Sequence, residues 1–320
     1  MRLLALLMSI YSLYGCREIE DVLRIDSPGL PSPIDLQVFA DRQDEVEERL
    51  IENFVQFGYV APLNSQYEPE LGDSLLWTGI SMGIFDCSEA KVFFDAVESS
   101  ALNRQGALVR AEPLPEKYVN DPTSRDMIVG AIFGLVLYAK KCDKIRPQLL
   151  LKLFMNFVRS NQGRIHSHGD STKINVQPGF RYFLNLISWK LLNTPKPVAI
   201  DAGSFEAGLI SGAVLITSSK EACYPLHLTT LMAITLAVIE EPISQTSKMS
   251  FCELTAGSGL NLTDWFCGRN DGKDFLHSYE FDSHDYIHQR CESWESIEHP
   301  GFNPGLDWLI LKKLSDGSAL

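Results

Sequence analysis

The chain has 320 residues, 45% of them hydrophobic and 22% charged, and this length is enough to bury a sizeable apolar core. Its formal net charge is −13, from 41 acidic and 28 basic side chains. The sequence shows no basic run, so its composition argues against nucleic acid as a partner.

The first residues have the pattern of a lipoprotein signal peptide. Residues 1–15 carry Arg2 and then an apolar stretch too short to span a bilayer, and the ending "LYGC" resembles a bacterial lipobox in which Cys16 is acylated. Residues 16–35 are polar and rich in proline, which is typical of a flexible tether. These segments predict a protein of the bacterial cell envelope, held to a membrane by its N-terminal lipid. The alternatives are an ordinary secretory signal and a buried N-terminal helix.

Residues 36–320 are predicted to form a single all-α domain, because helical periodicity recurs and alternating strand patterns are almost absent. The predicted helices, in chain order, lie at about 36–58, 73–86, 89–101, 125–141, 147–160, 179–193, 204–219, 225–240, 245–255 and 305–314. The uncharged run at 223–239 contains Pro225 and His227, which favour a buried helix over a membrane span.

The links between these helices are of two lengths. Short links such as "DCS" (86–88) and "CDKIRP" (142–147) join the members of a pair, whereas the links between pairs run to about twenty residues. Loops of that length in a compact domain tend to be functional. The pattern predicts helical hairpins whose long loops gather on one rim of the fold.

Three pairs of glycines, each four residues apart, lie within predicted helices. They are Gly79/Gly83, Gly130/Gly134 and Gly208/Gly212. A glycine inside a helix costs about 1 kcal/mol relative to alanine, so the repetition requires an explanation. We expect close approach of helix backbones at these positions; chance placement in buried helices is the alternative.

Cysteine usage suits a compartment that permits disulfides. Besides Cys16 there are Cys87, Cys142, Cys223, Cys252, Cys267 and Cys291, and six cysteines allow fifteen pairings among which the sequence does not choose. Free buried thiols are the alternative. No CxxC pair occurs, and His284 and His288 lack the further ligand of a zinc protease, so no metal site is expected. Walker and dinucleotide motifs are also missing, and no cofactor is expected.

Four short motifs carry a family resemblance. They are "GDSLLWTG" (72–79), "GALVRAEP" (106–113), "SRDMIVGAIFG" (124–134) and "PGLDWLILKKL" (304–314). Together they resemble (α/α) toroid proteins of the six-hairpin glycosidase-like class, over roughly residues 40–315. That class contains glycoside hydrolases, polysaccharide lyases and members without demonstrated activity. The resemblance implies an (α/α) toroid and a polysaccharide or oligosaccharide as ligand.

Asp73 and Asp126 each begin a helix that such a toroid would place on its inner side. If the inner helices are parallel, the two carboxylates converge on one cleft and act as general acid and base, or as acid and nucleophile. Glu112, on the long loop between the two helical pairs, is the next candidate acid. The alternative is that the aspartates only cap their helices, a role that stabilises a helix by about 0.3–2 kcal/mol.

Basic and aromatic residues near these acids are candidates for binding the substrate. Arg125 is placed to bind a sugar carboxylate, unless it pairs with Asp121 or a neighbouring loop. Arg110 is a second candidate, unless it is an ordinary loop charge. Tryptophans can stack on sugar rings or fill the core, and the candidates are Trp77, Trp265, Trp294 and Trp308.

The loop "GRIHSHGD" (163–170) offers a second set of catalytic residues. His166 and His168 share one side of the chain if the segment is extended, and a histidine pair can serve as acid and base. Lyases of the resembled fold commonly use histidine, tyrosine and arginine, which adds Arg181 and Tyr182. A hydrogen-bonded surface loop is the alternative.

The leading prediction is acid–base cleavage of a carbohydrate polymer by an envelope lipoprotein. The two alternatives are β-elimination by the histidine loop and non-catalytic binding of a glycan or a protein partner.

Overall fold

The structure is a computed structural model, and it describes residues 40–63, 68–69, 71–166, 178–197, 203, 205–211, 223–256, 260–269, 276 and 305–319. The predicted signal peptide, the lipidation site Cys16 and the tether lie outside these residues. So do His168, Gly212, His284, His288, Cys291 and Trp294.

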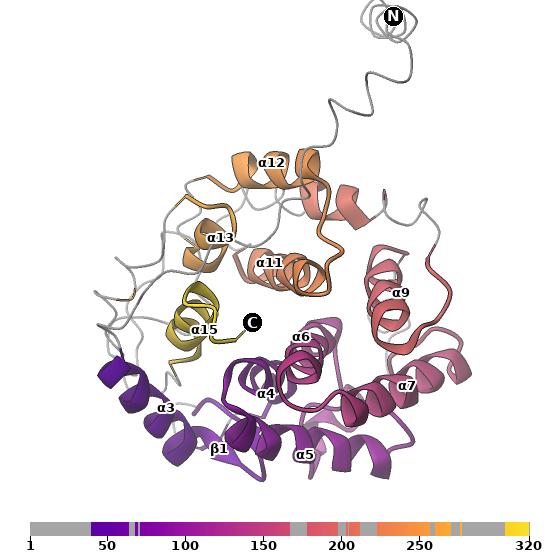
Figure 1. Cartoon of the computed structure of the whole chain (residues 1–320). Helices are drawn as coiled ribbons and strands as arrows, with labels where there is room; N and C mark the ends of the chain where they lie inside the picture. Colours follow the sequence, from indigo (N-terminus) through magenta and orange to yellow (C-terminus); the bar gives the residue numbers. More distant parts are fainter. Residues whose placement is uncertain are drawn as a thin grey trace, which may run out of the picture.

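The described chain is almost entirely helical, which confirms the prediction of an all-α fold (Figure 1). The helices are α3 (Ala40–Phe54), α4 (Ser74–Ile84), α5 (Cys87–Asn103), α6 (Arg125–Lys141), α7 (Ile145–Ser160), α9 (Pro178–Leu192), α11 (Cys223–Val238), α12 (Gln245–Leu254), α13 (Asn261–Phe266) and α15 (Leu306–Ser315), with a short 3-10 helix, η2 (Glu116–Tyr118). Most predicted boundaries agree within about one helical turn.

The first predicted helix is too long, because a tight turn interrupts it. Helix α3 ends at Phe54, and the chain then forms an antiparallel hairpin of β1 (Val55–Gln56) and β2 (Tyr59–Val60). Phe57 and Gly58 have φ angles of 52° and 80°, the left-handed values of a two-residue hairpin loop. The prediction of a helix to about residue 58 is therefore wrong at its end.

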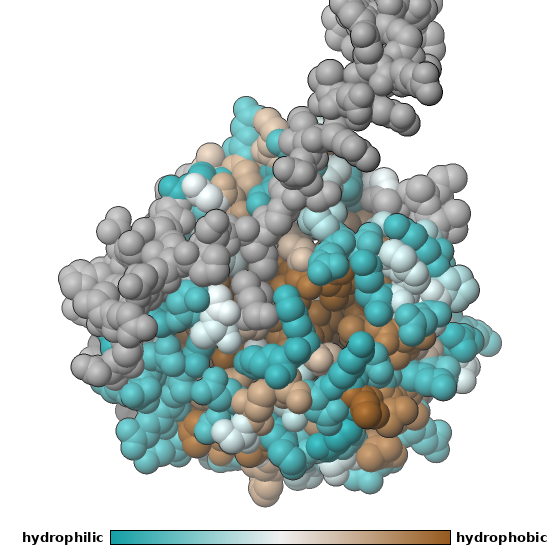
Figure 2. All heavy atoms as spheres, in the orientation of Figure 1, coloured by the Kyte–Doolittle hydropathy of each residue, from teal (hydrophilic) through white to brown (hydrophobic). Residues whose placement is uncertain are grey.

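Helices α4 and α6 lie inside the fold, with α3, α5 and α7 along the outside (Figure 1). Every residue of α4 is buried, and α6 is buried from Met127 to Ala139. On the face shown in Figure 2, hydrophilic side chains cover much of the outer helices, and hydrophobic side chains are exposed near the middle. Helices that are apolar on all sides belong in such an interior position.

Backbones of α4 and α6 approach each other along their glycines, which we call the glycine seam (Gly79, Gly83, Gly130 and Gly134). A Cβ added to Gly130 would lie 2.6 Å from the carbonyl oxygen of Leu76, and one added to Gly83 would lie 3.2 Å from Cα of Gly134. The predicted close approach is confirmed for these two pairs. Residue numbers rise together along both helices, so α4 and α6 run parallel.

The third glycine pair has a different setting. Gly208 is exposed, and a Cβ added to it meets no described atom within 4 Å. The prediction of close packing is therefore wrong for Gly208. This glycine lowers the stability of its helix, and no close packing of described residues offsets that loss.

Helix α11 is buried along most of its length, as predicted for the uncharged run at 223–239. Its threonines satisfy their hydroxyls locally: Thr230 donates to the carbonyl oxygen of Leu226 at 2.9 Å, and Thr235 donates to that of Leu231 at 2.7 Å. Within the described residues, no helix combines the length and hydrophobicity needed to cross a bilayer.

Two disulfides join described cysteines. Cys87, the first residue of α5, bonds to Cys142, which follows α6, across a sequence separation of 55 residues. Cys252 of α12 bonds to Cys267, which follows α13, across 15 residues. The alternative of free buried thiols is therefore wrong for these four cysteines.

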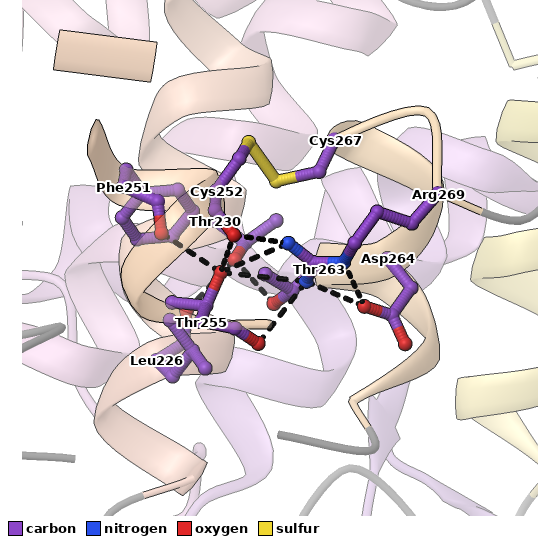
Figure 3. Close-up of polar contacts among 9 residues, drawn as sticks. All are labelled: Leu226, Thr230, Phe251, Cys252, Thr255, Thr263, Asp264, Cys267 and Arg269. Carbon is purple, nitrogen blue, oxygen red and sulfur yellow. Dashed lines mark hydrogen bonds and ion pairs between the residues drawn. A yellow bond between two sulfur atoms is a disulfide. The ribbon is translucent and has the colours of Figure 1, made fainter. Parts of the chain in front are cut away.

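The second disulfide lies beside a cluster of polar contacts around Arg269 (Figure 3). Its guanidinium donates to the carbonyl oxygens of Cys252 and Thr255, and its Nε donates to the Asp264 carboxylate at 2.7 Å. These contacts hold the short helix α13 against α12. Helix α13 was not predicted, because six residues are too few to show a helical period.

Candidate functional site

Asp73 and Asp126 lie at the same end of the fold, because α4 and α6 are parallel. Asp73 stands three residues before Leu76, and Asp126 stands four residues before Gly130, which contacts Leu76. Each helix rises about 1.5 Å per residue, so the two carboxylates are at nearly the same level. The arrangement brings two acids from separate inner helices to one rim.

Arg110 is the centre of the polar contacts at this end, with only 7% of its surface exposed. Its Nη1 donates to the carbonyl oxygen of Gly72 and lies 3.7 Å from Oδ1 of Asp73. Its Nε and Nη2 donate to the backbone carbonyl and the carboxylate of Asp121, each at 2.7 Å. Since these donors are engaged by the protein, Arg110 is not an ordinary loop charge, and its role as a substrate ligand stays a prediction. Its role is to hold Asp73 and the loop before α6.

His166, on the loop after α7, lies near Asp121, the carboxylate that accepts from Arg110. Its side chain is 2% exposed, and its Nε2 lies 4.0 Å from Oδ1 of Asp121. On the other side, the ring of Tyr118 covers the Arg110 guanidinium at 4.6 Å. Asp121 therefore connects the loop before α6 with the loop after α7, which were predicted to share a rim.

Hydrogen-bonded capping does not explain the two aspartates. Ser124 caps α6, its side chain accepting a hydrogen bond from the backbone N–H of Met127 at 3.5 Å. Asp73 occupies the N-cap position of α4 but forms no side-chain capping hydrogen bond. The first-turn position of Asp126 still favours its negative charge through the helix dipole. The capping alternative is therefore wrong for the side-chain hydrogen bonds of the pair, while its dipole part still applies to Asp126.

The surroundings of the two carboxylates differ. Burial raises the pKa of Asp126 above its ordinary value of 3.8, and the negative charge of Asp73 adds to the increase, while Arg125 and Arg110 oppose it. The Asp73 side chain is 38% exposed and lies beside the Arg110 guanidinium. The two carboxylates therefore differ in burial and in their charged neighbours.

Replacing Asp126 by asparagine is expected to stabilise the protein at neutral pH. A carboxyl whose folded-state pKa is raised contributes most stability below its unfolded pKa, and the contribution is lost as pH rises through the folded pKa. An asparagine side chain stays uncharged at every pH, so the variant avoids the cost of burying an ionised carboxylate. Thermal unfolding should therefore show a higher Tm for the variant at about pH 7 and no difference at about pH 3. A lower Tm at neutral pH would contradict the effect of burial on this carboxyl.

Glu112, the third predicted acid, has partners other than those of Asp73 and Asp126. Its carboxylate lies 2.6 Å from Nε of Arg104 and accepts from the Ser100 hydroxyl at 3.5 Å. The Glu112 carboxylate is thus engaged by Arg104 and Ser100 and not by the contacts at the start of α4 and α6. Asp73 and Asp126 are therefore the better-placed acids.

The other predicted ligands are scattered. Arg125 is half-buried beside Asp126. The alternative ion pair between Arg125 and Asp121 does not form among the described residues, and Asp121 bonds to Arg110 instead. Arg181 is exposed on α9, and the adjacent Tyr182 ring lies 6.1 Å from that of Phe205. His168, the predicted partner of His166, lies outside the described residues.

Three of the four tryptophans that were predicted to stack on sugar rings are described by the structure, and the prediction is wrong for them. Trp77, Trp265 and Trp308 are at most 1% exposed and belong to the hydrophobic core. A side chain without accessible surface cannot stack on a sugar ring. The alternative of core packing holds for all three.

Two hydroxyls beside the acids were not singled out by the sequence. Ser74 and Thr123 are buried, and neither hydroxyl has a hydrogen-bond partner among the described residues. Ser74 follows Asp73 directly, and Thr123 lies three residues before Asp126. Buried hydroxyls normally find partners, so these two are exceptions within the described structure, and their burial keeps them from contact with a ligand. The described part of the chain holds no cluster of histidine, cysteine or acidic residues suited to a metal.

Comparison of the chain with protein-family models, curated proteins and solved structures found no match. Function is therefore argued from the site itself.

Proposed function

We propose that the protein is an envelope lipoprotein whose (α/α) toroid binds a carbohydrate polymer and cleaves it by acid–base hydrolysis. The observation that carries the proposal is the placement of Asp126 and Asp73 at the common end of α4 and α6, with burial acting to raise the pKa of Asp126. Two carboxylates with different surroundings are what glycoside hydrolysis requires. Inner parallel helices flanked by outer ones are in keeping with a toroid, and residues 1–16 with a lipid anchor.

In this proposal Asp126 is the general acid. Its proton passes to the glycosidic oxygen as the bond from that oxygen to the anomeric carbon breaks. Asp73 is the second carboxylate of the pair, which either takes a proton from the attacking water or attacks the anomeric carbon itself. Arg110 positions Asp73, and Arg125 is placed to bind a polar or anionic group of the substrate.

Asp126→Asn is expected to lower hydrolytic turnover by about 100-fold or more, because an amide cannot donate the proton. Purified protein is incubated with bacterial and plant polysaccharides, and new reducing ends are measured together with the ultraviolet absorbance of unsaturated products. Asp44→Asn, at an exposed position of α3, is the matched control and should leave turnover unchanged. Since Asp126→Asn is expected to stabilise the fold, unfolding would not explain a loss of activity.

Other outcomes redirect the assignment. Parental turnover by Asp126→Asn would remove this residue from the mechanism. Ultraviolet absorbance would indicate β-elimination, with His166, His168 or Tyr182 as base and Arg125 or Arg181 neutralising the substrate.

Non-catalytic binding of a glycan or a protein is the second candidate function. It is favoured by three surface pockets around α7, whose described lining residues include neither Asp73 nor Asp126. Binding without turnover, by protein shown to be folded, would support this candidate over hydrolysis.

A further inference from the structure

Three pockets adjoin one another around α7. One, of about 650 Å³, lies between α7 and the loop before α6; two others, of about 570 Å³ and 440 Å³, lie between α7 and α9. Asn156 lines the first and second pockets, and Arg159 and Asn185 line the second and third. The pockets therefore form one continuous surface across α7, which we call the α7 band.

The charge of the α7 band is opposite to that of the whole protein. Its described lining residues include no aspartate or glutamate, although 41 of the 320 residues are acidic. Arg104 is neutralised by Glu112 at 2.6 Å. Lys152, Arg159 and Arg181 form no ion pair with a described carboxylate. Cations without counter-charges in an acidic molecule attract anionic ligands.

The neutral part of the band suits a sugar. Amide side chains, including those of Asn156, Asn161 and Asn185, supply donors and acceptors for hydroxyl groups. Phe157 is the one phenylalanine, tyrosine or tryptophan among the described lining residues. Single-stranded nucleic acid is bound on several aromatic platforms, which makes a glycan the better fit.

The band also leads to the candidate active site. His166 lines the largest pocket and faces the Asp121 carboxylate at 4.0 Å. Val109 and Pro122, which line the same pocket, are the chain neighbours of Arg110 and Asp121. A polymer lying along the band would therefore extend toward the rim that carries the two acids.

We propose that the α7 band binds an acidic polysaccharide, one whose sugar units carry regularly spaced carboxylate or sulfate groups. Lys152, Arg159 and Arg181 pair with the anionic groups, and the asparagines bind the hydroxyls. The proposal rests on the proposed function in taking the ligand to be a glycan, and it names the class of that glycan. Binding is measured without turnover, so its outcome is independent of the roles of Asp73 and Asp126.

The test compares two forms of one polymer. Oligomers of galacturonic acid, labelled with a fluorophore, are titrated with the protein at about 50 mM salt and followed by anisotropy. Fully methyl-esterified oligomers have the same backbone without the charge. The acidic form is expected to bind at least about tenfold more tightly, and its affinity should fall as salt is raised.

A charge-matched pair of variants locates the binding. Arg159→Gln with Arg181→Gln removes two charges from the band and should weaken binding of the acidic oligomer by roughly tenfold or more. Lys91→Gln with Lys140→Gln removes two exposed charges elsewhere and should leave it within about twofold. Heparin oligosaccharides distinguish sulfate from carboxylate as the preferred group.

Several results would overturn the proposal. Equal affinity for the acidic and esterified oligomers, or no binding of galacturonate and heparin oligomers, would refute it. So would binding of polyglutamate or oligothymidylate as tight as that of the acidic glycan, since the band would then recognise charge alone. Equal losses in the two double variants would place the binding elsewhere.

Discussion

Replacing Gly130 by alanine is expected to lower the free energy of unfolding by about 3 kcal/mol or more. The new Cβ would lie 2.6 Å from the carbonyl oxygen of Leu76 and 2.8 Å from its Cα, where a side chain cannot turn away. Both helices are buried on every side at this point, so the backbones cannot separate without disturbing the core. The gain of about 1 kcal/mol in helix propensity is too small to offset this cost.

Gly208→Ala is the control for the same chemical change. Gly208 is exposed and its Cβ would meet no described atom within 4 Å, so this variant should gain up to about 1 kcal/mol. Denaturant unfolding of both variants beside the parent measures the contrast. Similar stability of the Gly130 and Gly208 variants would show that the glycine seam is not a close contact.

Removing the Cys87–Cys142 disulfide is expected to cost about 4 kcal/mol, the chain-entropy value for a closed loop of 55 residues. The bond joins the start of α5 to the end of α6. Lys141 reinforces that junction by donating to the carbonyl oxygens of Gly83 and Phe85 at the end of α4. Paired replacement of both cysteines by serine leaves no unpaired thiol.

The Cys252–Cys267 disulfide provides the comparison. It closes a loop of 15 residues, worth about 3 kcal/mol by the same account, and the Arg269 hydrogen bonds hold the segment without it. Guanidinium unfolding should therefore show a larger loss for the Cys87/Cys142 pair than for the Cys252/Cys267 pair. The reverse order would show that loop length does not govern the two contributions.

Spacing along the sequence was sufficient to predict most of the helices and a close approach of helix backbones at the glycines. Glycines four residues apart lie on one face of a helix, so the spacing of Gly79/Gly83 and Gly130/Gly134 is enough to indicate a backbone contact. Gly208 shows the limit of this rule. It begins the same four-residue spacing but is exposed, because the pattern says nothing about what lies opposite a glycine.

The contacts of the candidate site were less predictable. Arg110 lies in a loop that has no period, and its partners Gly72 and Asp121 are 38 and 11 residues away. Its burial depends on how the loop folds back onto the start of α4. Likewise, Ser124 rather than an aspartate caps α6, because capping depends on the local backbone angles as well as on residue type.

The parallel pair α4 and α6 is anchored three times: by Arg110 at one end, by the glycine seam in the middle and by Lys141 with the Cys87–Cys142 bond at the other end. The spacing of Asp73 and Asp126 is consequently a property of the frame rather than of the surrounding loops. Loops on such a frame can be exchanged, lengthened or diversified while the two acids keep their separation. Under the proposed function, new specificities would therefore be accessible, in evolution or by loop grafting, without rebuilding the acid pair.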